Sequence, residues 1–279
     1  MTDARILGDL RDGVLDAAQV LAAARALDEA ERSRKQIRLL SEDHPRMTMQ
    51  DAYEIQAAWV DLKVRAGDPQ IGWKIGLTSK AMQAALNIDV PDSGVLLKSM
   101  MFDNGARVPP GRFIQPRVEA ELAFVMARDV APDASPSEIL AATDYVAPSL
   151  EILDTRITRI DPQTGRARSV LDTIADNAAN AGVVMGEGRK GLSADDLRWS
   201  GAIVSRNGEV EETGLGAGVL GDPLLSMSWL AQRLGAYGQG IKAGQVVLSG
   251  SFIRPVEAPA GSDVTADFGP LGLVAIGFD

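Results

Sequence analysis

The sequence has no cysteine and only one histidine, His44, among its 279 residues. The missing cysteines exclude disulfide bonds, thiolate metal sites and a cysteine nucleophile. The lone histidine excludes zinc sites built from several histidines and any catalytic pair of histidines. A catalytic metal ion would therefore need oxygen ligands, which are the ligands that Mg2+ and Mn2+ prefer.

Acidic residues outnumber basic ones, 38 to 28, and long apolar runs are missing. The formal net charge is −10, which argues against nucleic-acid binding, because that needs clustered Lys and Arg. No apolar run approaches the roughly 20 residues of a membrane helix, and residues 1–13 lack the apolar core of a signal peptide. We therefore expect a cytoplasmic protein without a membrane or nucleic-acid partner. An anionic substrate remains compatible, because one local cation can dominate inside a cleft.

Two helices are predicted before residue 69. Residues 17–40 are rich in Ala, Glu, Arg and Lys, which are good helix formers. A second helix is predicted to begin at Thr48, which forms a capping-box pattern with Asp51, and to end before Gly67. These segments predict a small helical N-terminal cap region over residues 1–68.

The remainder, residues 69–279, is predicted to be one β-rich catalytic domain, which gives an α+β fold. Cap residues at Ser135 and Asp222 predict two further helices, each with Pro at its first position. Asn207-Gly208 predicts a hairpin turn. The predicted strands are 118–126, 202–205, 209–212, 245–249 and 271–278.

The most informative strand carries Glu119 and Glu121. Side chains alternate along a strand, so both carboxylates point to one face while apolar residues fill the other. At normal strand rise their Cα atoms lie roughly 6.5 Å apart, which lets both reach one ion. Spacing alone leaves two interpretations open: a metal site, or an edge strand with a solvated face.

A third acid, Glu151, lies inside an apolar run, where an unpaired charge is costly. A metal ion or a basic partner would offset that cost, and three carboxylates with waters suit a hard cation. Asp154 follows three residues later, and an ordinary surface or turn role fits it better than ligation.

A lysine segment begins where the helical region ends. Lys74 is flanked by Trp73 and Ile75, so it is expected to emerge from a short buried strand. Beside a metal ion its pKa would fall toward neutrality, which suits acid–base work, although a snorkelling surface lysine is the alternative. The backbone N–H groups that follow, at Leu77 and Thr78, can face an anionic substrate.

Several motifs together resemble the hydratase/decarboxylase branch of the fumarylacetoacetate hydrolase superfamily. The first group is GWKIGLTSKAMQ, PDSGVLL and RFIQPRVEAELAFV. The second group is SLEILDTRI, DPQTGRARSVLDTIADNAANAGVVMG, RNGEVEETG and GQVVLSGSFIRPV. The match runs from about residue 35 to the C-terminus, and the joint occurrence of the motifs is specific. The second group is most similar to the 2-oxohept-4-ene-1,7-dioate hydratases of aromatic meta-cleavage catabolism.

The resemblance implies a mixed β-roll with a helical N-terminal region, a Mg2+ or Mn2+ cofactor and a homo-oligomer. Carried over motif by motif, it makes Glu119, Glu121 and Glu151 the metal ligands. It makes Lys74 the active-site lysine and Asp92 an acid–base or water-orienting residue. On the sequence alone, Asp92 is more typical of a turn.

The implied reaction is addition of water to a small 2-oxo carboxylate through a metal-stabilised enolate. The second substrate carboxylate needs a cation, for which Arg254 and Arg156 are candidates, although a structural salt bridge fits either equally. Ser251 is a candidate hydrogen-bond partner of the substrate. Asp176 and Asn177 either line the pocket or cap a turn.

Trp73 stands where the resemblance leads us to expect His or Tyr, and Phe268 stands where Tyr is common. Both departures bear on pocket shape and therefore on the choice of substrate. His44 fits a helix-cap or loop role better than a lid over the site. Two related activities remain as alternatives: hydration of 2-hydroxypenta-2,4-dienoate and decarboxylation of a 2-oxo-hexenedioate.

Overall fold

The computed structural model describes residues 13–80, 83, 88 and 90–279. Most of the N-terminal segment expected to lack a signal peptide, and part of the motif over residues 72–83, lie outside the described residues. Among the described residues, two β-sheets and a set of helices share one buried apolar core. No described helix is long and apolar enough to cross a membrane.

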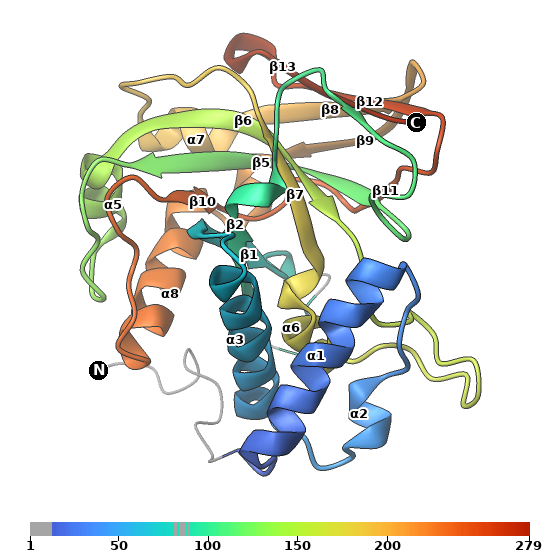
Figure 1. The fold of residues 1–279 in the computed structure, drawn as a ribbon. Coiled ribbons are helices and arrows are strands. Elements are labelled where there is room, and N and C mark those ends of the chain that lie inside the picture. The colour runs from blue at the N-terminus through green and yellow to red at the C-terminus, as the bar shows by residue number, and fades with distance from the viewer. Residues whose placement is uncertain (1–12, 81–82, 84–87, 89) are drawn as a thin grey trace.

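The larger sheet is eight-stranded and mixed, with the order β2-β1-β10-β5-β6-β7-β3 and with β11 also paired to β5. Its strands are β1 (Gln70–Gly76), β2 (Asp92–Leu97), β3 (Met101–Phe102), β5 (Arg117–Met126), β6 (Thr143–Leu153), β7 (Asn180–Met185), β10 (Val246–Leu248) and β11 (Val256–Glu257). β1 pairs in parallel with β10 and antiparallel with β2. The long pair β5 and β6 is antiparallel and curves across the molecule (Figure 1).

The second sheet is five-stranded, with the order β4-β13-β12-β8-β9. Its strands are β4 (Arg107–Val108), β8 (Gly201–Arg206), β9 (Glu209–Leu215), β12 (Ser262–Asp267) and β13 (Leu273–Phe278). It lies on the side of β5 and β6 that faces away from the N-terminal helices (Figure 1). The core is therefore continuous from Leu27 and Trp59 in those helices to Phe124 and Ile276 in the two sheets.

The N-terminal helices pack together at one end of the molecule (Figure 1). These N-terminal helices are α1 (Ala17–Ser33), α2 (Leu40–Asp43) and α3 (Met49–Arg65). The α-helices described later in the chain are α5 (Pro136–Ala142), α6 (Val170–Ala175), α7 (Ala194–Trp199) and α8 (Pro223–Ala236). The prediction of a single helix over residues 17–40 is wrong after residue 33. α1 ends at Ser33 because Arg34 turns into the left-handed region, with φ of 60°, and its N–H donates to Ala30.

The starts of the other three predicted helices and the hairpin turn are confirmed. Thr48 and Asp51 form the capping box of α3, and Ser135 and Asp222 cap α5 and α8. Asn207 and Gly208 join β8 to β9 with φ values of 55° and 86°. The positive φ at both central residues is the backbone that an Asn-Gly hairpin turn requires.

Removal of the N-cap of α3 tests how much this cap contributes to stability. We expect Thr48→Ala to lower the free energy of unfolding by about 1 kcal/mol, because it removes the side chain that accepts from the Asp51 N–H. Urea unfolding should show a lower midpoint with an unchanged slope. An unchanged midpoint would show that the cap contributes nothing to stability.

Candidate active site

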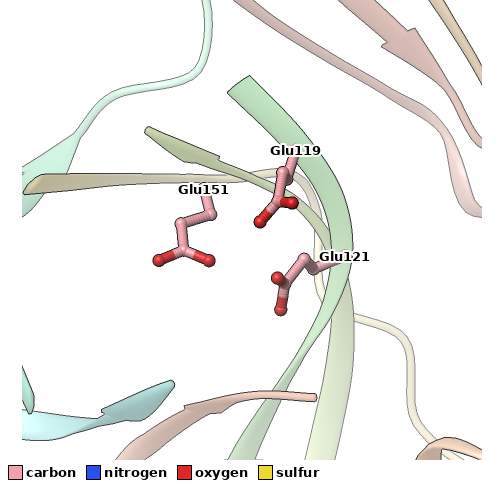
Figure 2. Close-up of side chains that lie close together, drawn as sticks. All are labelled: Glu119, Glu121 and Glu151. Atoms are coloured by element: carbon pink, nitrogen blue, oxygen red, sulfur yellow. The ribbon is translucent and has the colours of Figure 1, made fainter. Parts of the chain in front are cut away.

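Three carboxylates converge from two neighbouring strands. β5 carries Glu119 and Glu121, and β6 places Glu151 directly opposite Glu119 in the antiparallel register. One oxygen from each of the three lies within 4.8 Å of the others, and Figure 2 shows the three side chains turned toward one space. β5 lies between β10 and β6, so the edge-strand interpretation is wrong.

The carboxylates are held on one side and free on the other. Glu121 and Glu151 are both fully buried. One oxygen of Glu121 accepts from the Gly250 N–H at 2.8 Å, and one oxygen of Glu151 accepts from the Asn180 amide at 2.6 Å. The other oxygen of each has no hydrogen-bond partner among the described residues. Buried unpartnered carboxylate oxygens of this kind fit a hard divalent cation, which takes oxygen ligands.

The mutual repulsion of these acids has a direct electrostatic consequence. Burial, with the charge of Glu151, raises the pKa of Glu119 to about 8. Burial, with the charges of Glu151 and Glu119, raises the pKa of Glu121 well above its usual range. Glu119 and Glu121 therefore tend to keep their protons near neutrality unless a cation replaces them.

Lys74 approaches the same carboxylates from β1. Its side chain is almost fully buried, and its Nζ lies 3.4 Å from an oxygen of Glu151. Burial by itself lowers the pKa of Lys74, but Glu151 and Asp92 outweigh burial, so the net pKa is raised. The protein groups alone therefore do not lower the pKa of Lys74, and the lowering predicted from the sequence would need the metal ion.

Asp92 faces Lys74 from the first position of β2. The register pairs Asp92 with Gly76 of β1, and the Asp92 side chain is buried. Burial raises the pKa of Asp92, although Lys74 and Arg168 partly oppose the effect. A side chain at Gly76 would place its Cβ 2.2 Å from Asp92 and 2.8 Å from the Lys74 Nζ, so glycine there leaves room for both groups.

A cavity of about 400 Å³ opens onto this cluster. The residues predicted from sequence that line it are Lys74, Leu77, Thr78, Asp92, Glu119 and Ser251. Glu121 and Glu151 lie beneath the lining and reach the same carboxylate cluster. The structure thus brings together residues from β1, β2, β5 and the loop after β10.

Four other predicted residues lie outside the cavity lining. Asp176 is buried and forms an ion pair with Arg156, whose guanidinium also lies over the Trp59 ring. Asn177 bonds both backbone groups of Val95 through its amide. Asp176, Arg156 and Asn177 therefore lie behind the cavity lining and support it.

Arg254 is mostly exposed, with 78% of its side chain accessible, and pairs with Glu212 at 2.6 Å. Neither Arg254 nor Arg156 lines the cavity, so neither is placed to bind a second substrate carboxylate there.

The remaining sequence candidates have structural partners. The Asp154 carboxylate accepts from the backbone N–H groups of Ile114 and Gln115, and His44 lies at the C-terminal cap of α2. Trp73 donates to Gln245 on the sheet face opposite Lys74, and Phe268 packs edge-on against Phe252. Neither aromatic residue lines the cavity, so the two departures from the expected pattern do not shape it directly.

Sequence reasoning missed Asn180, which orients Glu151. The preceding residues Asn177, Ala178 and Ala179 all have left-handed φ values, of 53°, 51° and 59°. This turn brings Ala178 and Ala179 to the cavity wall and delivers the Asn180 amide to the carboxylate. No composition signal marks three consecutive left-handed residues without glycine.

Comparison with known proteins places the chain in a family. It is 49% identical over 258 residues to the 2-oxo-hept-4-ene-1,7-dioate hydratase of Escherichia coli, covering 91% of this chain and 96% of that protein. The solved structure of 4-oxalocrotonate decarboxylase from Pseudomonas putida G7, complexed with magnesium and adipate, matches with a TM-score of 0.88 at 32% identity. The match covers 96% of this chain and all of that one. The chain belongs to the hydratase/decarboxylase branch of the fumarylacetoacetate hydrolase superfamily.

Membership in this branch confirms the predicted α+β fold with its mixed β-roll. A fumarylacetoacetate hydrolase family protein from Yersinia pestis CO92 shares the fold at 13% identity, with a TM-score of 0.56 over 76% of this chain and 94% of that one. No family model matched the chain.

Metal binding by this member of the branch is expected to depend on pH. Because Glu119 has a pKa of about 8, its proton must leave when a cation binds, so affinity rises with pH. For one released proton, the dissociation constant for Mg2+ should weaken about tenfold per pH unit below about 8. Calorimetric titrations in two buffers of different ionisation enthalpy would count the protons, and a pH-independent affinity would contradict this.

Asn180 should matter for the metal rather than for folding. Asn180→Ala removes the donor that holds Glu151, so we expect metal affinity to fall about 10-fold to 100-fold. The matched control is Asn104→Ala, which loses two side-chain hydrogen bonds to the backbone, with Leu273 and Ala275, in an exposed loop. Equal losses of metal affinity in the two variants would rule out a specific role for Asn180.

Proposed function

We propose that this chain is a divalent-metal-dependent hydro-lyase that adds water to 2-oxohept-4-ene-1,7-dioate. The observation that carries the proposal is the meeting of three carboxylates with Lys74 and Asp92 at one cavity. The 49% identity to a hydratase of this substrate supports the choice of reaction. The absence of cysteine and the placement of His44 outside the site agree with a mechanism that needs no nucleophilic side chain.

In this proposal Glu119, Glu121 and Glu151 hold Mg2+ or Mn2+. Three carboxylates leave ligand positions for the 2-oxo acid and water in the octahedral arrangement that these ions prefer. When bound, the ion supplies positive charge beside the 2-oxo group and stabilises an enolate. Mg2+ is the first choice, since a magnesium complex is known for the 4-oxalocrotonate decarboxylase that matches over 96% of the chain.

The proton transfers fall to Lys74 and Asp92. One proton leaves C3 of the substrate and one is returned at C5, which moves the double bond into conjugation with the ketone. Water then adds at C4, giving up one proton while C3 regains one, so the product is the substrate plus one water. The two side chains touch the same space and have opposite charge, which lets one accept while the other donates.

The neighbouring residues are proposed to bind the substrate. Leu77 and Thr78 follow β1 at the cavity wall, and the left-handed φ of 55° at Leu77 turns the backbone there. Ser251 lines the facing side, with its hydroxyl held by the Ile253 carbonyl at 2.8 Å. Asp176 and Asn177 are positioning residues that hold the wall.

Decarboxylation is the nearest alternative, because it needs the same metal and a similar enolate. The TM-score of 0.88 to a 4-oxalocrotonate decarboxylase is the observation in its favour. Incubation of the protein with Mg2+ and either substrate would separate the two, because release of CO2 identifies the decarboxylase.

We expect Glu121→Gln to lower kcat for hydration by at least about 1000-fold, because it removes one metal-binding charge from a buried site. Consumption of the substrate is followed by the loss of absorbance of its dienol tautomer, and formation of the product is followed by NMR. Glu187→Gln is the matched control, since that side chain is 79% exposed and lies outside the cavity. Full activity of Glu121→Gln, or of the wild type in excess EDTA, would refute the metal-dependent reaction.

A further inference from the structure

Three arginines line the cavity beyond the carboxylate cluster. Arg117 lies on β5 two residues before Glu119, so it points to the same face of the strand. Arg159 and Arg168 reach the cavity from the chain between β6 and α6. The cavity lining therefore combines Glu119 of the acidic cluster with a group of three arginines, which is called the basic end below.

The basic end has more positive than negative charge. Arg117 and Arg159 share one oxygen of Glu257, at 2.5 Å and 2.9 Å, and half of the Glu257 side chain is exposed. The carboxylate nearest to Arg168 among the described residues is Asp176 at 3.8 Å, which Arg156 already binds. The three guanidinium groups of the cavity lining thus face two carboxylates, and one of these already pairs with Arg156.

Arg168 is the least compensated of the three. Its side chain is 18% exposed, and among the described residues its guanidinium donates only to the Thr155 hydroxyl, at 2.6 Å. Burial, together with the charges of Arg156 and Arg117, lowers the pKa of Arg168 despite the nearby acids. A buried cation of this kind, with donors left over, suits bidentate binding of a carboxylate.

We propose that Arg168, assisted by Arg159 and Arg117, binds the distal carboxylate of a dicarboxylate substrate whose 2-oxo acid end lies at the metal-binding carboxylates. Along β5 the Cα atoms of Glu119 and Glu121 lie about 7 Å and about 13 Å from that of Arg117. That range brackets the length of an extended seven-carbon diacid. The inference rests on the proposed function and replaces Arg254 and Arg156 as the candidate cations.

The inference makes Arg168 a specificity-determining residue. A substrate without the second carboxylate would leave the spare donors of Arg168 unpaired, and an unpaired buried donor discriminates strongly against such a substrate. The wild type should therefore prefer the seven-carbon diacid to 2-hydroxypenta-2,4-dienoate.

The test compares kcat/KM on these two substrates in variants of the full-length protein with Mg2+. We expect Arg168→Gln to lower the diacid-to-monoacid ratio of kcat/KM about 100-fold, mainly through KM for the diacid. Arg168→Lys should restore part of the ratio, since the positive charge remains. Arg166→Gln is the matched control, because Arg166 lies two residues away, is 73% exposed and pairs with Glu42.

An unchanged ratio in Arg168→Gln, or a ratio lost instead in Arg254→Gln, would overturn the inference. If the wild type hydrates neither substrate, the proposed function fails but the inference is still decided by binding. Calorimetry with 2-oxoheptanedioate and 2-oxopentanoate on the Mg2+-loaded protein then replaces kinetics. A diacid preference abolished by Arg168→Gln supports the inference, whereas no preference in the wild type overturns it.

Discussion

The antiparallel register of β5 and β6 is the constraint on which the site depends. It places Glu119 opposite Glu151, with Glu121 one step along the same face. Three like charges at that spacing in a buried sheet are unfavourable unless a cation lies among them. The surrounding contacts serve this arrangement, because the Gly250 N–H and the Asn180 amide fix one oxygen of each buried acid and leave the other available.

Charge then explains the rest of the cavity. Lys74 and Asp92 form a second pair of opposite sign beside the cluster, while Arg117, Arg159 and Arg168 add positive charge to the cavity lining. In the proposed binding mode, a dianionic substrate would meet a metal ion held by the acids at one end and guanidinium groups at the other. The net charge of −10 does not prevent this, because short-range contacts inside the cavity outweigh the overall charge.

The sequence predicts what depends on local pattern. Period-two alternation in β5, the cap at Thr48 and the Asn-Gly turn all follow from neighbours in the chain. The sequence fails where distant segments meet. Arg254 looked suitable from its motif but is exposed, whereas Arg168 reaches the cavity because its loop folds back against Thr155. Such long-range packing leaves no periodic signal.

The two ends of the cavity are built from different kinds of structure but are not independent. The metal-binding end lies on paired strands, whereas Arg159 and Arg168 lie on the loop between β6 and α6, where substitutions are easier to accommodate. Asp176 lies 3.8 Å from Arg168, and the left-handed turn that follows leads directly to Asn180 and its bond to Glu151. Five consecutive residues, from Asp176 to Asn180, thus connect the surroundings of Arg168 to Glu151, which is one of the proposed metal ligands.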